Sequence, residues 1–316
     1  MKRIILNFFI QFASIYLVVK YFVLDNINSE NLTLIFSDHI IYLFVFLILI
    51  KFFFSYIFSL IINLITEKKN TFLSITDIIL QGGLINQLVP GLGYVFNYYK
   101  LNFNSNISLV EYSISQSTWS ILNIFSYIFL ALISGFIFIS GLELNISFIY
   151  LIFSFFILIL FFLYLYKIKN YIYVFIKNYL LKLLLLSSVY NELRVIKENL
   201  VNNFKKFIII FIAVIFKSMF ECIAFYVALS MFGADISFMA SNYLWIASSL
   251  TIGLLLINYF GFFELILFAS SALIIPEFND MIIFGISFRI LNILALICAL
   301  ILASFSKAFI GKKINK

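Results

Sequence analysis

Residues 81–97 read QGGLINQLVPGLGYVFN, and this glycine-rich stretch with a central proline interrupts a chain that is otherwise strongly apolar. Pro90 cannot continue the hydrogen-bond ladder of a helix, and the glycines around it permit backbone conformations that other residues avoid. The stretch therefore predicts two short helices joined at a break. The break would free backbone amides and carbonyls beside the polar side chains of Asn86, Gln87 and Asn97. A glycine and proline kink without a ligand is the alternative.

The composition around this break excludes most classes of protein. The chain has 316 residues, of which 64% are hydrophobic and 11% are charged, and its mean hydropathy is +1.13. A water-soluble fold of this size cannot bury so much apolar surface. We therefore expect an all-α, polytopic membrane protein and exclude a soluble enzyme, a nucleic-acid-binding protein and a secreted disulfide scaffold. The single histidine, His39, and the two cysteines, Cys222 and Cys298, offer no metal-ligand spacing, so we expect no metal and no cofactor.

Long apolar segments set the predicted architecture. A transmembrane helix needs about 20 mainly apolar residues. Full spans are expected near residues 4–24, 40–65, 112–139, 146–166, 207–230 and 282–305. Two further stretches, 71–99 and 240–275, are interrupted by glycine, proline and polar residues. No linker or second domain is visible, so we expect one transmembrane domain over residues 1–316.

The distribution of charge predicts the orientation of this domain. Acidic residues without any lysine or arginine occupy the connecting segments 25–38, 141–145, 231–239 and 276–280. Most of the basic residues lie near the two termini and in residues 66–70 and 167–206. Positive charge favours the cytoplasmic side of a membrane. We therefore expect both termini in the cytoplasm.

This orientation requires both interrupted stretches to return to the side from which they enter. Residues 71–111 lie between a basic segment and a span that ends outside, and 240–275 lie between two acidic segments. We therefore expect two helical hairpins or re-entrant loops that enter from opposite faces, with turns near Gly93 and Gly261. Such a pair is what an inverted repeat would produce, and it points to a transport site near the middle of the bilayer. Merely kinked helices are the competing interpretation.

Residues 167–206 form a long basic segment between the two halves of the chain. Lysine and arginine are mixed there with isoleucine, tyrosine, phenylalanine and leucine, which suits helices that lie in the membrane interface. We expect this segment to attract anionic lipids at the cytoplasmic face, with about 1 kcal/mol for each basic residue near the surface. An ordinary positively charged loop explains the segment at least as well.

Ionisable residues within apolar segments are costly and need a partner or a function. The candidates are Lys51, Asp77, Lys217, Glu221, Glu264 and Arg289. Lys217 and Glu221 are four residues apart, so they can pair on one helix face, and a purely structural role explains this pair. Glu264 ends the motif NYFGFFE, which begins at Asn258. Arg289 is the natural counter-charge for Glu264 or for a phosphate group, because a guanidinium binds phosphate with two parallel hydrogen bonds.

These features together resemble a known family. The run from Asn86 to Gly93 with its Pro-Gly-Leu-Gly, the Gly261-x-x-Glu264 turn and Arg289 are similar to the flippase-like membrane region of lysylphosphatidylglycerol synthases and their stand-alone relatives, over residues 4–305. The resemblance implies a bacterial inner-membrane protein that moves a lipid or a lipid-linked group between leaflets. The sequence ends without the aminoacyl-transfer domain of the synthases, so we do not expect synthesis of the lysyl lipid.

The chain departs from the family pattern at both breaks. Family members commonly place an acidic residue directly after the first Pro-Gly-x-Gly and an arginine three residues later, where this chain has Tyr94 and Asn97. Their second motif usually opens with Pro-Gly-Gly, where this chain has Asn258, Tyr259 and Phe260. Since a charged pair is missing, the head-group contacts or the lipid itself are expected to differ from those of the family.

The leading hypothesis is a lipid flippase or flippase-like transporter whose partner is a membrane phospholipid or a lipid-linked substrate. An intramembrane transferase acting on lipid-linked substrates is less favoured, since neither paired carboxylates nor a nucleophile beside a base are visible in the sequence. A non-catalytic accessory membrane protein is the third hypothesis. The expected substrate-binding residues are Asn86, Pro90, Gly91, Gly93, Asn97, Asn258, Gly261, Glu264 and Arg289, and the expected structural ion pair is Lys217 with Glu221. The sequence leaves the oligomeric state open.

Overall fold

A computed structural model describes residues 39–66, 72–88, 91–140, 195–196, 198–199, 202–255, 262–274 and 281–314. Within these ranges the regular elements are helices. They are α4 (His39–Thr66), α5 (Phe72–Leu88), α6 (Leu92–Ser105), α7 (Leu109–Ser140), α11 (Phe204–Met231), α12 (Phe238–Leu255), α13 (Phe262–Ile274) and α14 (Met281–Ile314). The predicted all-α membrane bundle is therefore confirmed.

Four of these helices are long and apolar enough to cross a membrane. The candidate spans are Ile40–Thr66, Leu109–Ser134, Phe204–Met231 and Met281–Ser306. They match the expected spans near 40–65, 112–139, 207–230 and 282–305. The other two expected spans, 4–24 and 146–166, and most of the basic segment 167–206 lie outside the described residues.

Local sequence signals explain where α6 ends and α7 begins. Asn106 adopts a left-handed conformation with a φ of 51°, which ends α6. Ser108 and Glu111 then form a reciprocal cap. The Glu111 amide donates to Ser108 Oγ at 3.1 Å, and the Ser108 amide donates to Glu111 Oε2 at 2.8 Å. Two amides of the first turn of α7 are satisfied in this way.

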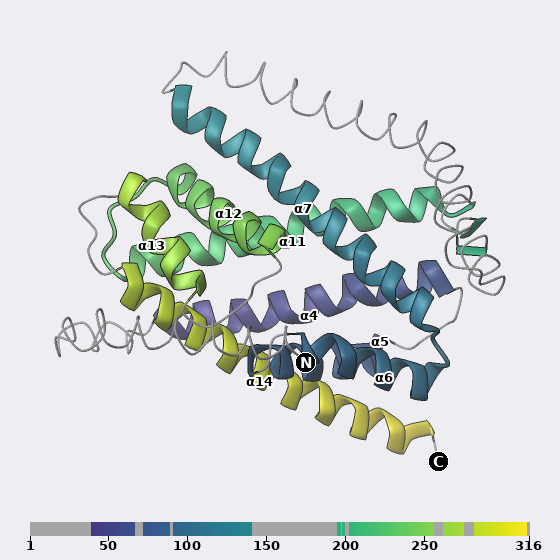
Figure 1. The fold of residues 1–316 in the computed structure, drawn as a ribbon. Coiled ribbons are helices and arrows are strands. Elements are labelled where there is room, and N and C mark those ends of the chain that lie inside the picture. Colours follow the sequence, from purple (N-terminus) through teal and green to yellow (C-terminus); the bar gives the residue numbers. More distant parts are fainter. Residues whose placement is uncertain are drawn as a thin grey trace, which may run out of the picture.

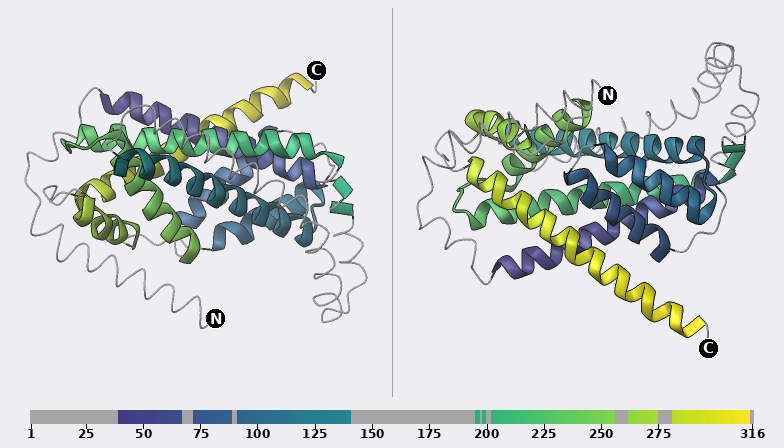
Figure 2. Two further views of the ribbon diagram at one scale, coloured as in Figure 1. Left: turned by 90° about the horizontal axis from the view of Figure 1, so that it is seen from above. Right: turned by 60° about the horizontal axis from the view of Figure 1, so that its bottom comes forward.

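Both interrupted stretches fold into pairs of short helices. α5 and α6 form the first hairpin, which packs against α4 and α14, and α12 and α13 form the second, which packs against α7, α11 and α14 (Figure 1). The two hairpins occupy different ends of the bundle, and the turned views show the same separation (Figure 2). α14 contacts both of them, so this last helix serves as a common axis for describing their direction.

The first hairpin approaches the middle of α14 from the carboxyl-terminal end of α14. Near the start of α5, Asp77 accepts a hydrogen bond from Ser304 Oγ at 3.4 Å. Near the end of α5, Gln87 accepts a hydrogen bond from Arg289 at 3.4 Å. α5 therefore runs antiparallel to α14, and its tip lies at the level of Arg289.

The second hairpin reaches the same level from the other end. Glu264, in the first turn of α13, contacts Arg289, and Leu267 lies against Gly285. α13 therefore also runs antiparallel to α14, but it extends from Arg289 toward the amino-terminal end of α14. The predicted arrangement of two opposed, broken hairpins is confirmed, and straight helices through both stretches are excluded.

Two apolar cores lie along the bundle, with a polar layer between them. On α4, residues 43–50 contribute to one core and residues 57–65 to the other. Lys51 lies between these two parts of α4. α11 contributes to both cores in the same way, and Lys217 lies between its two parts. We call the level of Lys51 and Lys217, which lies near the middle of the described spans, the polar layer.

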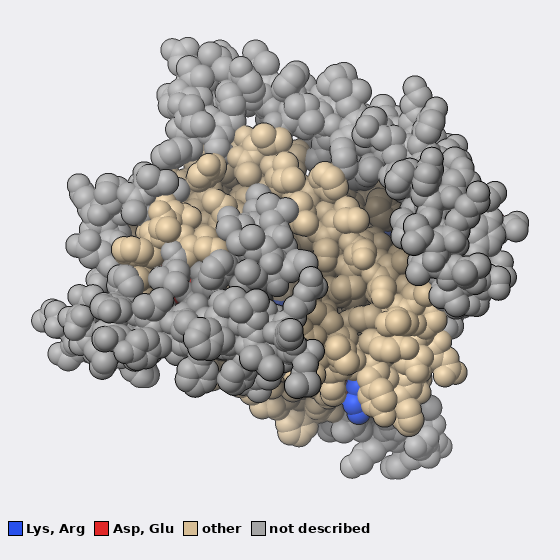
Figure 3. Space-filling model, in the orientation of Figure 1, with Lys and Arg blue, Asp and Glu red and all other residues tan. Residues whose placement is uncertain are grey.

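The outer surface of the bundle suits lipid. On the face shown in Figure 3, the described surface is almost entirely uncharged. Large apolar or aromatic side chains are exposed on several spans, including Tyr42 on α4, Ile209 on α11 and Ile301 on α14. Because apolar side chains at this density favour a hydrocarbon environment, the chain is an integral membrane protein.

Candidate functional site

A side chain of the predicted site closes the break between α5 and α6. The amide of Gly91 donates a hydrogen bond of 2.7 Å to Asn86 Oδ1. Gly91 has a φ of 86°, a conformation that residues with a Cβ atom rarely adopt. Asn86 thus satisfies a backbone donor at the start of α6. The Gly91 amide is therefore not one of the free donors that the interruption predicts. Pro90 lies outside the described residues.

The two helices of the first hairpin cross through glycine. A Cβ atom on Gly93 would collide with the carbonyl oxygen of Gly82, and a Cβ atom on Gly82 would collide with the Asn97 side chain. Asn97 is only 7% exposed and lies between α5 and α6. The structure thus gives Gly93 and Asn97 a place in the packing of the hairpin. Their role in substrate binding stays a prediction.

The tips of both hairpins meet at one arginine. Arg289 Nη1 lies 3.3 Å from both carboxylate oxygens of Glu264, and Arg289 Nη2 donates to Gln87 Oε1 at 3.4 Å. Glu264 is fully buried and Arg289 is 7% exposed. Gly285 permits this approach, because a Cβ atom there would lie only 3.2 Å from Glu264 Cγ. We call Gln87, Glu264 and Arg289 the hairpin cluster, and it joins both hairpins to the last span.

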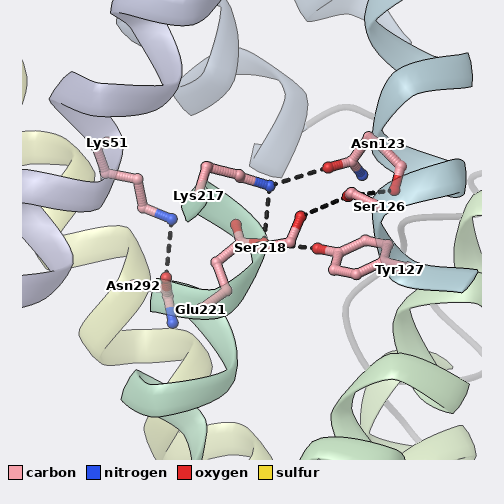
Figure 4. A network of polar contacts seen from close by, with 8 residues as sticks. All are labelled: Lys51, Asn123, Ser126, Tyr127, Lys217, Ser218, Glu221 and Asn292. Atoms are coloured by element: carbon pink, nitrogen blue, oxygen red, sulfur yellow. Dashed lines mark hydrogen bonds and ion pairs between the residues drawn. The ribbon is translucent and has the colours of Figure 1, made fainter. Parts of the chain in front are cut away.

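A second buried cluster connects α7 to α11 (Figure 4). Lys217 Nζ lies 2.7 Å from Glu221 Oε2, which also accepts a hydrogen bond of 2.6 Å from the Tyr127 hydroxyl. Lys217 donates to Asn123 Oδ1 at 3.2 Å, and its ammonium stands 5.2 Å from the centre of the Trp119 ring. We call Asn123, Tyr127, Lys217 and Glu221 the span cluster. The structure contains the expected Lys217–Glu221 pair and shows that α7 supplies its further partners.

Some hydrogen-bonding partners in the polar layer were not singled out from the sequence. Lys51 was recognised as costly, but its partner was not; its Nζ donates to Asn292 Oδ1 at 2.8 Å, from α4 to α14 (Figure 4). Asn123 and Tyr127 were missed as well. The available signal was an amide or a hydroxyl near the middle of a long apolar run, although the sequence does not tell which helix faces it.

Other predicted residues have a different environment or lie outside the description. Asp77 accepts hydrogen bonds from Gln81, in the next turn of α5, and from Ser304 of α14, so it joins these two helices away from Arg289. Asn258 and Gly261 belong to the connection between α12 and α13, which lies outside the described residues. In the ranges that are described, no three His, Cys, Asp or Glu residues are grouped as a metal site would require.

The fold and the clusters define a class of protein: a polytopic helical membrane protein in which two opposed, broken hairpins meet at a buried ion pair. A family model matches residues 8–299, and the chain belongs to this family, which is described as the lysylphosphatidylglycerol synthase TM region. Searches of curated proteins and of solved structures found no match. Membership of the family links the chain to lipid modification or lipid flipping.

Proposed function

We propose that the protein is a lipid flippase or flippase-like transporter that moves a phospholipid or a lipid-linked group between the leaflets of the bacterial inner membrane. The observation that carries the proposal is the contact of both hairpin tips with Arg289 at mid-bundle. Paired interrupted helices that meet inside a membrane are typical of transport sites. We further propose that both termini are cytoplasmic and that the basic segment 167–206 contacts anionic lipids.

Arg289 is the proposed ligand for a lipid phosphate. A guanidinium can hold two phosphate oxygens at once, and charge-assisted hydrogen bonds are usually about 2.7–2.9 Å long. The 3.3 Å contacts between Arg289 and Glu264 are longer than this range. A phosphate oxygen that approached Arg289 would therefore compete with loose contacts rather than with an optimal ion pair.

The neighbouring residues have supporting roles in this proposal. Glu264 keeps the guanidinium oriented when no lipid is bound, and Gln87 offers a neutral amide from the first hairpin. Asn86, Gly91 and Gly93 keep the tip of the first hairpin in position, and they too remain proposed substrate-binding residues. Pro90, Asn97, Asn258 and Gly261 remain proposed substrate-binding residues at the two breaks. The acyl chains would stay in the surrounding lipid while the head group passes the cluster.

A leaflet-translocation assay tests the proposal. The purified chain is reconstituted into liposomes with a fluorescent phospholipid, and the label in the outer leaflet is quenched by an impermeant reductant. Arg289→Lys keeps the charge but loses the two-pronged geometry, and Glu264→Gln keeps the shape but loses the charge. We expect each variant to lower the translocation rate by about tenfold, the effect of one charge-assisted contact.

The matched control is Asp235→Asn, which removes a carboxylate charge from an exposed position between α11 and α12. It should translocate lipid at the wild-type rate. Unchanged rates in both Arg289→Lys and Glu264→Gln, with the protein folded and monodisperse in detergent, would remove the assignment of the hairpin cluster.

A further inference from the structure

Lys51 carries a charge that the hairpin and span clusters do not neutralise. It lies near the middle of the span Ile40–Thr66 and is partly buried. An ammonium group has three N–H donors, and the acceptor shown for Lys51 Nζ among the described residues is the neutral amide oxygen of Asn292. A cation at this depth is costly unless an anion or water compensates for it.

The numbers of described positive and negative charges near the level of Lys51 are not equal. Lys217 is paired with Glu221, and Arg289 is paired with Glu264. Lys51 donates to the neutral amide oxygen of Asn292. Three cations therefore face two carboxylates among these described residues, which leaves one positive charge in excess. One monovalent anion would balance the charges of these described residues.

Asn292 connects Lys51 with the proposed transport site. Asn292 follows Arg289 by three residues on α14, so the two side chains are neighbours on the surface of that helix. The Asn292 amide nitrogen donates to the carbonyl oxygen of Phe288 at 3.0 Å, which holds its oxygen toward Lys51. An anion at Lys51 would therefore lie about one helical turn from the guanidinium of Arg289.

We propose that Lys51, held by Asn292, binds the phosphodiester of an anionic phospholipid and selects such lipids over zwitterionic ones at the transport site. The proposal rests on the proposed lipid transport and adds the lipid class and the residue that selects it. A phospholipid with a net charge of −1 neutralises the excess charge, whereas a zwitterionic phospholipid brings its own cation to the same place. The preference should therefore follow the net charge of the head group.

Two measurements on the full chain test the proposal. The first compares thermal unfolding in detergent with added phosphatidylglycerol, phosphatidylcholine or inorganic phosphate. The second compares translocation of fluorescent phosphatidylglycerol and fluorescent phosphatidylcholine in the same liposomes. The variants are Lys51→Met, which keeps a long unbranched side chain but loses the charge, and Lys51→Arg, which keeps the charge. The control is Asp235→Asn, which removes an exposed charge from the connection between α11 and α12.

We expect phosphatidylglycerol to stabilise the wild type, Lys51→Arg and Asp235→Asn more than phosphatidylcholine does. Lys51→Met should lose this difference, and its ratio of phosphatidylglycerol to phosphatidylcholine translocation should fall by about tenfold. An unchanged lipid preference in Lys51→Met overturns the proposal. Equal stabilisation by inorganic phosphate assigns the site to a soluble anion and overturns the lipid assignment.

The unfolding assay does not depend on transport. If neither the wild type nor any variant moves lipid, the proposed function fails. The lipid-dependent stabilisation then still decides whether Lys51 binds an anionic lipid. If Arg289→Lys and Glu264→Gln abolish transport while Lys51→Met keeps the lipid preference, only the inference about Lys51 fails.

Discussion

The hairpin cluster and the span cluster are both buried ion pairs, but they differ in geometry and in origin. Lys217 and Glu221 are 2.7 Å apart on one helix, and each makes a further hydrogen bond to a side chain of α7, Asn123 or Tyr127. Glu264 and Arg289 are 3.3 Å apart and belong to different helices, with a third helix supplying an amide. The first arrangement is tight and the second is loose.

We propose that this difference separates a structural role of the span cluster from a ligand-binding role of the hairpin cluster. A pair four residues apart on one helix forms as soon as that helix forms, and its contacts to Asn123 and Tyr127 hold α7 against α11. The hairpin cluster requires both hairpins and α14 to be in place at once. We propose that its longer contacts to Glu264 leave Arg289 able to accept another anionic partner at a lower cost.

The largest expected effect comes from replacing the hairpin pair with apolar residues. Glu264→Leu with Arg289→Met removes both members of the pair, so neither is left without its partner and the chain should still fold. We expect lipid translocation in liposomes to fall to the protein-free background. Transport at the wild-type rate in a folded double variant would contradict the separation of roles.

A single replacement in the span cluster should have the next largest effect, on stability. Lys217→Met leaves the Glu221 carboxylate without its cation in the middle of the bundle, which costs about 3 kcal/mol. We expect a clearly lower unfolding temperature in detergent. Lys206→Met, at an exposed position, is the control and should unfold at the wild-type temperature. Equal temperatures for the two variants would show that the Lys217–Glu221 pair contributes little.

The close crossing of α5 and α6 fixes the position of the hairpin tip that carries Gln87 of the hairpin cluster. Gly93→Ala places a Cβ atom against the carbonyl oxygen of Gly82, so we expect about 1–3 kcal/mol of destabilisation and slower transport, because the tip that carries Gln87 shifts. Gly83→Ala is the matched control, since its Cβ atom would make an ordinary 3.5 Å contact with Leu296. Unfolding and translocation of the two variants should differ, and equal behaviour would argue against the glycine crossing.

The smallest effect is expected from replacing the span pair as a unit. Lys217→Met with Glu221→Leu removes both members of the pair, so neither is left without its partner, and apolar replacements of a buried ion pair are often neutral. We expect stability within about 1 kcal/mol of the wild type and translocation within about twofold. A large loss of transport in this double variant would place the span cluster in the transport mechanism.

Sequence reasoning predicted the helices and the two breaks well, because each depends on local chemistry, and it named Arg289 as a counter-charge for Glu264, which the structure contains as a pair. Apolar runs give spans, and glycine with proline gives an interruption. It did not predict that Asn86 satisfies the Gly91 amide or that Asn97 packs against Gly82, since these contacts depend on how α5 and α6 cross. It also missed Asn292 as the partner of Lys51, because those residues are 241 positions apart.

The amino-acid sequence by itself determined that this chain is a helical membrane protein with two interrupted elements. It also determined the Lys217–Glu221 pair, because a separation of four residues puts both side chains on one helix face. Only the tertiary structure decided that Gln87, Glu264 and Arg289 meet and that Lys51 faces Asn292. These contacts join helices that are distant in the chain. Side-chain periodicity gives the face of each helix, whereas the neighbour of that face is set by the packing of the whole bundle.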